Sequence, residues 1–234
     1  MATFDHNFAI ALCISASITG LLYSFFRLTE KQQRKKFRNA WLEIIDKMTD
    51  AFRISFRNKT VRIIYTVAIL FGIGTGGIFA FWQPAFAELN NWNESELGFY
   101  FMLISLAVII GAKISGYFKP SMGKYSIALF TLWLFLALAG FVHLPILAPI
   151  FILVWEVALG FVQPLESTLL NQNTKSETRA TNISIKNMAY RLGFAIIGFA
   201  IYLVGDFKIN EVWIVTSFAF FIAAIIVVFT KVKN

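Results

Sequence analysis

Four ionisable residues lie inside two long apolar stretches and are the strongest candidates for chemistry in this sequence. They are Glu156 and Glu166 in residues 151–170, and Lys186 and Arg191 in residues 183–205. Ionisable side chains inside a membrane helix are costly, so they usually pair or line a water-filled cavity. If a turn near Lys175 joins two antiparallel helices, Glu156 and Arg191 lie at similar depth near the middle of the bilayer. We therefore predict that these two side chains face each other.

Two interpretations of this pair stay open. Glu156 and Arg191 either form a buried structural ion pair, or Glu156 is a carboxylate that changes protonation or meets a cationic substrate. Glu166 and Lys186 form a second candidate pair nearer the cytoplasm. Together with Arg179, this second pair is predicted to gate the cytoplasmic side rather than to contact substrate.

Three amides extend the candidate binding surface. Gln163 follows Glu156 by seven residues and Asn187 precedes Arg191 by four, so each amide shares a helix face with its charged neighbour. Gln83 lies near the outer end of another apolar stretch and faces either a cavity or the following loop. A polar stripe that faced lipid would be expensive, so these faces should point into the bundle.

Composition excludes most other classes of protein. Hydrophobic residues make up 58% of the chain and charged residues 15%, and the mean hydropathy is +0.67, unlike a soluble domain of this length. The net charge of +8 comes from basic residues placed between apolar stretches, so we expect no nucleic-acid partner. Metal-ligand spacings, nucleophile elbows and phosphate loops are absent from the sequence, so we expect no enzymatic activity, no cofactor and no metal site.

The apolar stretches predict an all-α, polytopic membrane protein with seven transmembrane helices. The expected spans are residues 8–26, 61–81, 98–118, 125–142, 147–170, 183–204 and 212–230. The predicted domains are an N-terminal transmembrane helix (1–26), a basic amphipathic linker on the cytoplasmic side (27–60) and a six-helix bundle (61–234). The first span carries its basic residues after it rather than before it, so we interpret it as a retained helix and not a signal peptide.

The basic residues predict the orientation in a cell membrane. Assigning residues 27–62, 113–124, 175–191 and 231–233 to the cytoplasm places 11, 3, 4 and 2 of the 21 Lys and Arg residues there, and leaves only Lys208 outside. This strict alternation follows the positive-inside rule. The N-terminus is therefore expected to be external and the C-terminus cytoplasmic.

Several motifs resemble those of one transporter family. Residues 169–193 contain an Asn near a helix end and the run Arg179-Ala180-Thr181 before Ser184, and they resemble the junction of the tenth and eleventh helices in the major facilitator superfamily. Residues 81–86, "FWQPAF", resemble the seventh helix of drug-efflux members. The loop "GYFKPSMGK" has the glycine spacing of the family's loop motif but carries Pro120 and Ser121 where that motif has Asp and Arg.

This resemblance implies that the chain is the C-terminal half of such a transporter, from helix six to helix twelve. The implied function is proton-coupled efflux of a small molecule by alternating access, with an amphiphilic or cationic drug as the candidate substrate. The implied partners are protons, the lipid bilayer, and an N-terminal half or a second copy that completes the bundle. The alternative is a truncated, non-transporting membrane remnant or a protein that binds other helices.

Overall fold

The described residues form six long helices. The structure is a computed structural model that describes residues 49, 53, 56–142, 144–205 and 208–230, without the side chain of Glu177. The helices are α3 (Lys59–Asn90), α4 (Glu94–Ser115), α5 (Met122–Phe141), α6 (Leu147–Gln172), α7 (Arg179–Val204) and α8 (Ile209–Phe229), with a short 3-10 helix, η1 (Ser176–Thr178), before α7. Each of the six is long and apolar enough to cross a membrane.

Polar caps determine where several helices begin. The Asn58 side chain accepts hydrogen bonds from the backbone N–H groups of Thr60 and Val61 at the start of α3. Asn93 and Glu96 form a capping box at the start of α4, and Ser121 caps α5. These caps satisfy N–H groups that have no partner within the helix, so they separate one apolar stretch from the next.

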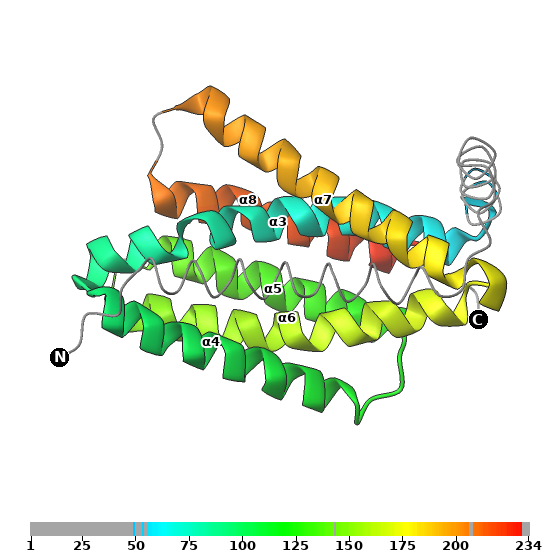
Figure 1. The fold of residues 1–234 in the computed structure, drawn as a ribbon, viewed down its shortest axis with the longest axis horizontal. Coiled ribbons are helices and arrows are strands. Elements are labelled where there is room, and N and C mark those ends of the chain that lie inside the picture. The colour runs from blue at the N-terminus through cyan, green and yellow to red at the C-terminus, as the bar shows by residue number, and fades with distance from the viewer. Residues whose placement is uncertain (1–48, 50–52, 54–55, 143, 206–207, 231–234) are drawn as a thin grey trace, which may run out of the picture. The chain divides into compact units, whose positions relative to one another are not determined.

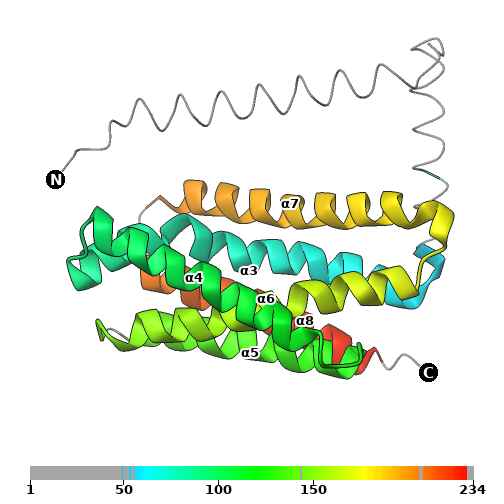
Figure 2. The ribbon, with the colours of Figure 1, turned by 60° about the horizontal axis from the view of Figure 1, so that its bottom comes forward.

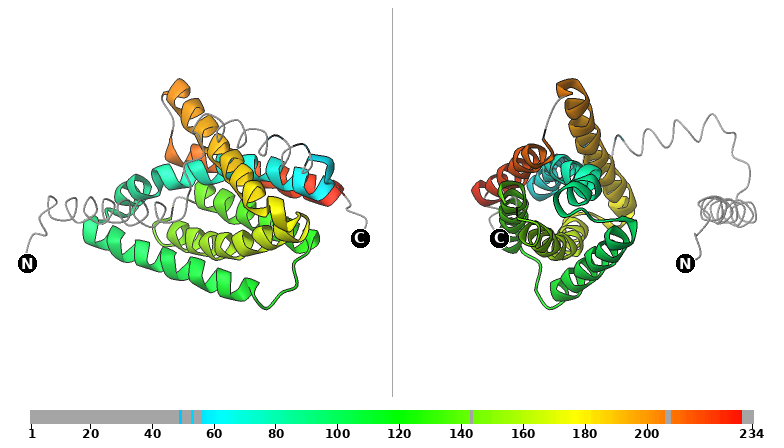
Figure 3. Two further views of the ribbon diagram at one scale, coloured as in Figure 1. Left: turned by 45° about the vertical axis from the view of Figure 1, so that its right-hand side comes forward. Right: turned by 90° about the vertical axis from the view of Figure 1, so that its left-hand side faces the viewer.

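The helices run alternately in opposite directions between two ends of the bundle. We call the end with the α4–α5 and α6–α7 connections the basic end, because it carries Lys119 and Lys175, and the other end the opposite end. Neighbours pack in the order α7, α3, α8, α5, α6, α4, as the end-on view of Figure 3 and the side views of Figures 1 and 2 show. Helices α4 and α7 therefore stand at the two ends of this series.

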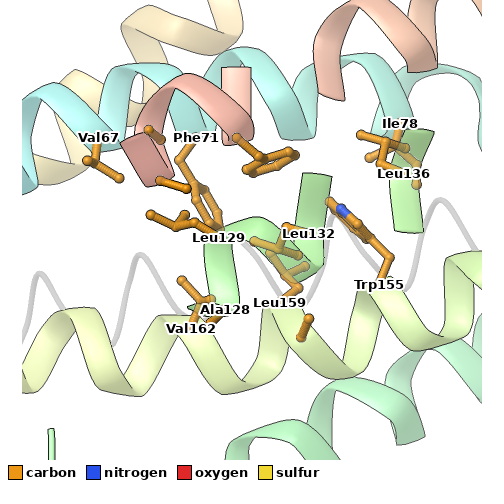
Figure 4. Close-up of a cluster of buried hydrophobic side chains, with 14 of the residues drawn as sticks. Val67, Phe71, Ile78, Ala128, Leu129, Leu132, Leu136, Trp155, Leu159 and Val162 are labelled. Atoms are coloured by element: carbon orange, nitrogen blue, oxygen red, sulfur yellow. The ribbon is translucent and has the colours of Figure 1, made fainter. Parts of the chain in front are cut away.

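The apolar core lies between α3, α5, α6 and α8. Figure 4 shows part of it, with Phe71 and Ile78 of α3 facing Leu132 of α5 and Trp155 of α6. Helices α4 and α7 contribute little to this core: only 22% of the most apolar segment of α4 and 6% of that of α7 is buried. Both helices thus leave most of their surface for lipid or for another protein.

Glycines bring two pairs of helix backbones into contact. Gly72 of α3 lies against the backbone at Tyr190 of α7, and Gly193 of α7 lies against the backbone at Ile69 of α3. In the same way, Gly111 of α4 and Gly160 of α6 each lie against the backbone of the other helix. A Cβ atom at any of these four positions would overlap a carbonyl group, so small residues set the distance between these helices.

The predicted all-α membrane fold is confirmed for the described residues. The six spans expected between residues 61 and 230 correspond to α3–α8, although α3 continues through Pro84 to Asn90 instead of ending at residue 81. Trp82, in this extended part of α3, is 7% exposed and packs beside Tyr100 and Phe101. The first span (8–26) and nearly all of the linker lie outside the described residues.

The glycine contacts predict a position-dependent effect within one helix. A Gly193→Ala substitution should destabilise the protein by about 1–3 kcal/mol, because the new methyl group meets the Ile69 carbonyl and forces α7 away from α3. Gly198→Ala on the same helix is the matched control, since nothing lies within 4 Å of a Cβ there. Thermal unfolding of the two purified variants in detergent measures the difference. Equal midpoints would contradict the close approach of the two backbones.

Candidate functional site

A buried polar network ties three helices together near the basic end. The Lys186 ammonium of α7 donates to Glu166 Oε2 of α6 at 3.0 Å, and the Tyr125 hydroxyl of α5 donates to Glu166 Oε1 at 2.9 Å. Glu166 is only 6% exposed. Each carboxylate oxygen therefore has a donor, and the buried negative charge has a counter-ion.

The second carboxylate of α6 has a different environment. Glu156 is 3% exposed, yet among the described residues it accepts no hydrogen bond and forms no ion pair. It lies one helical turn before Gly160, which contacts the backbone of Val108, so Glu156 is on the side of α6 that faces α4. Tyr100 of α4 lies within electrostatic range of this carboxylate and donates its own hydrogen bond to the Pro149 carbonyl.

The predicted pairing of Glu156 with Arg191 is wrong. Arg191 is exposed and forms no ion pair with Glu156. The reason is the rotation of α7: Gly193 faces α3, and Arg191 precedes it by two residues, which is roughly 200° around the helix. Arg191 therefore lies on the face of α7 turned away from α3. Similar depth in the membrane did not make the two residues neighbours.

The remaining candidates fall on exposed surface. Gln163, Gln83 and Asn187 are all exposed, and so is Arg179 at the start of α7. Asn187 shares its face with Arg191, one turn away, so these two residues form a polar strip on the exposed side of α7. The structure therefore brings Glu166 and Lys186 together as predicted, but it does not gather the other candidates around a single point.

Sequence analysis missed several polar contacts that join α7 to its neighbours. The Tyr65 hydroxyl of α3 donates to Asn182 Oδ1 at 2.5 Å, and the hydroxyls of Thr75 and Tyr190 lie 3.0 Å apart. Tyr125, which holds Glu166, was also missed. Tyrosines are common in apolar helices, so residue type alone did not distinguish these. Depth relative to the helix ends would have placed Tyr125 and Glu166 at the same level.

The site shows no arrangement suited to a metal ion. Within the part of the chain that the structure describes, no group of three or more His, Cys, Asp or Glu side chains is placed to bind one. Instead, the described residues contain two buried carboxylates on α6. Glu166, near the basic end, has a counter-ion, and Glu156, farther along the helix, has none among them. Together with six membrane-spanning helices, these features define a polytopic α-helical membrane protein with ionisable groups within its bundle.

Comparison with known proteins identifies the family. The family model described as Major Facilitator Superfamily matches residues 6–198, which is more than half of the chain. The chain therefore belongs to the major facilitator superfamily, whose members transport small molecules across membranes. Searches among proteins with curated descriptions and among solved structures found no match.

The network around Glu166 predicts strong coupling between two side chains. Lys186→Met should destabilise the protein by about 3 kcal/mol, because it leaves a buried carboxylate without a counter-ion. The additional change Glu166→Gln removes that charge and should restore a large part of the loss. Unfolding free energies of the two single variants and the double variant form the measurement. Lys175→Met, at an exposed position of the same end, is the control, and strictly additive effects of the pair would contradict the coupling.

Proposed function

We propose that this chain forms the C-terminal half of a proton-coupled exporter of small molecules, with Glu156 as the group that binds and releases the proton. The observation that carries the proposal is the carboxylate of Glu156, which is buried and has no partner among the described residues. An ionised carboxylate without a partner is very costly to bury. A group in this position gains a proton when it is closed off and loses it when water reaches it, which is what coupling to a proton gradient requires.

The exposed surfaces of α4 and α7 support the need for a second bundle. Both helices stand at the ends of the packing series and contribute little to the core. The exposed face of α7 carries Asn187 and Arg191, and a guanidinium at this depth is expensive to leave in hydrocarbon. In this family the substrate lies between two six-helix halves. We propose that Arg191, Asn187, Gln163 and Gln83 face such a second half or the substrate between the two.

The network at the basic end is the proposed cytoplasmic gate. Lys186 and Glu166 join α7 to α6, and the packing between these two helices is otherwise slight. Arg179 stands at the start of α7 and shares this end of the bundle. Placing the basic end in the cytoplasm of a cell membrane follows the positive-inside rule, with an external N-terminus and a cytoplasmic C-terminus.

An amphiphilic cation is the proposed substrate class. Glu156 supplies a negative group within the apolar bundle, and aromatic rings lie nearby, since Phe79 contacts Trp155 and Tyr100 contacts Trp82. Aromatic faces and a carboxylate together suit an apolar molecule that carries a positive charge. Exchange of such a cation for a proton at one carboxylate is a simple route to antiport.

The decisive variant is Glu156→Gln. With the full chain co-expressed with an N-terminal half in everted membrane vesicles, we expect wild-type protein to accumulate ethidium when the vesicle interior is acidified. Glu156→Gln should reduce this pH-driven accumulation at least tenfold, because the amide cannot exchange the proton. Glu94→Gln, an exposed carboxylate at the start of α4, is the matched control.

Two results would overturn this proposal in different ways. Unchanged pH-driven transport by the Glu156→Gln variant would remove Glu156 from proton coupling. Transport of ethidium by the purified chain alone would show that no second half is needed. If neither the chain alone nor the chain together with the N-terminal half transports any tested cation, although both proteins are folded, a role in helix–helix interaction is favoured.

A further inference from the structure

A cavity at the opposite end of the bundle is separate from Glu156 and from the network around Glu166. It has a volume of about 720 Å³ and lies where α3 and α5 end and α8 begins. Its walls are largely apolar, from Ala85, Leu89, Ala139, Val142 and Ile209. The size is within the range of pockets that hold small organic ligands.

Side chains of opposite charge line this cavity. Glu88 of α3 and Lys208 at the start of α8 both contribute to the lining, but they form no ion pair with each other. Each therefore remains available to a ligand. A cavity that presents a carboxylate on one helix and an ammonium on another suits a molecule carrying both charges.

An uncharged polar side chain lies on the Lys208 side of the cavity. The Asn210 side chain lines the cavity, is half-buried and makes no hydrogen bond to another described residue. Trp213 lies on the same wall and is 3% exposed. This side of the cavity is suited to an anion such as a phosphate.

The cavity lies at the depth of lipid headgroups. Three helix ends surround it, and the helices they belong to span the apolar layer. Its apolar walls belong to the ends of the spans, whereas the side chains of Glu88 and Lys208 are exposed. An acyl chain can follow the apolar walls while the headgroup remains among the polar side chains.

We propose that this cavity binds the headgroup of an ethanolamine phospholipid. The phosphate accepts from Lys208 and from Asn210, and the primary ammonium donates to the Glu88 carboxylate. Choline phospholipids carry the same phosphate, but their trimethylated nitrogen has no N–H to donate. Glu88 therefore discriminates between the two headgroups, while Lys208 contributes to the binding of both. This site does not depend on the transport proposal, since it shares no residue with the proposed proton site or gate.

Native mass spectrometry of the full chain in detergent tests the site, with equal amounts of palmitoyl-oleoyl phosphatidylethanolamine and phosphatidylcholine as probes. Wild-type protein should retain the ethanolamine lipid about five-fold more often. Glu88→Gln should abolish this preference while total lipid binding remains. Lys208→Gln should weaken the binding of both lipids by about three- to ten-fold. Glu94→Gln at the same end and Lys119→Gln at the basic end are the matched controls, and circular dichroism confirms that each variant is folded.

The possible outcomes separate the site from its alternatives. An equal affinity of wild-type protein for both lipids, or a preference that survives Glu88→Gln, would overturn the assignment. Soluble phosphoethanolamine provides a further arm, because it carries the same two charges without acyl chains. If it displaces the lipid at equal concentration, the cavity recognises a soluble zwitterion and the lipid assignment is wrong. If it does not compete, the acyl chains contribute to binding as proposed.

Discussion

The close approach of helix backbones at four glycines is the constraint on which the rest of this structure depends. Lipid solvates apolar side chains as well as another helix does, so helices in a membrane associate through van der Waals packing at short range. Gly72 and Gly193 provide this packing between α3 and α7, and Gly111 and Gly160 provide it between α4 and α6. These two contacts hold the outermost helices of the bundle and fix which of their faces stay exposed. The polar residues of α6 and α7 take their positions from that rotation.

The two glycine contacts are related by an internal symmetry. Exchanging α3 with α6, α4 with α7 and α5 with α8 converts every major packed pair into another packed pair, and α5–α8 into itself. Since α3 and α6 run in opposite directions, the three-helix units are inverted repeats, as is common in transporters of this family. The repeats differ in their polar groups. The α3–α7 contact carries the hydrogen bonds of Tyr65 with Asn182 and of Thr75 with Tyr190, whereas the α4–α6 contact buries Glu156.

The sequence predicted the helices and their depths but not their rotations. Hydrophobic length and the placement of basic residues are one-dimensional signals, and they were sufficient for six of the spans and for the Glu166–Lys186 pair near the turn. The mid-membrane pairing failed because depth leaves the rotation of each helix undetermined. Gly193 contained the missing information, since a glycine within a span marks the face of closest contact. Arg191, two residues before it, had to point elsewhere.

The two carboxylates of α6 lie in different surroundings along one helix. Glu166 is held by Lys186 and Tyr125, and a buried network that satisfies both carboxylate oxygens makes its surroundings rigid. Glu156 precedes it by ten residues, or about 15 Å along the helix, and has no such partner in the described part of the chain. Pro164 lies between them and removes one backbone hydrogen bond, so α6 can bend there.

In the proposed mechanism, the half of α6 that carries Glu156 moves together with α4, because Gly160 packs this half of α6 directly against α4. The other half stays attached to α5 and α7 until the gate opens. A change of protonation at Glu156 can then alter the packing against α4 without first breaking the buried ion pair of Glu166.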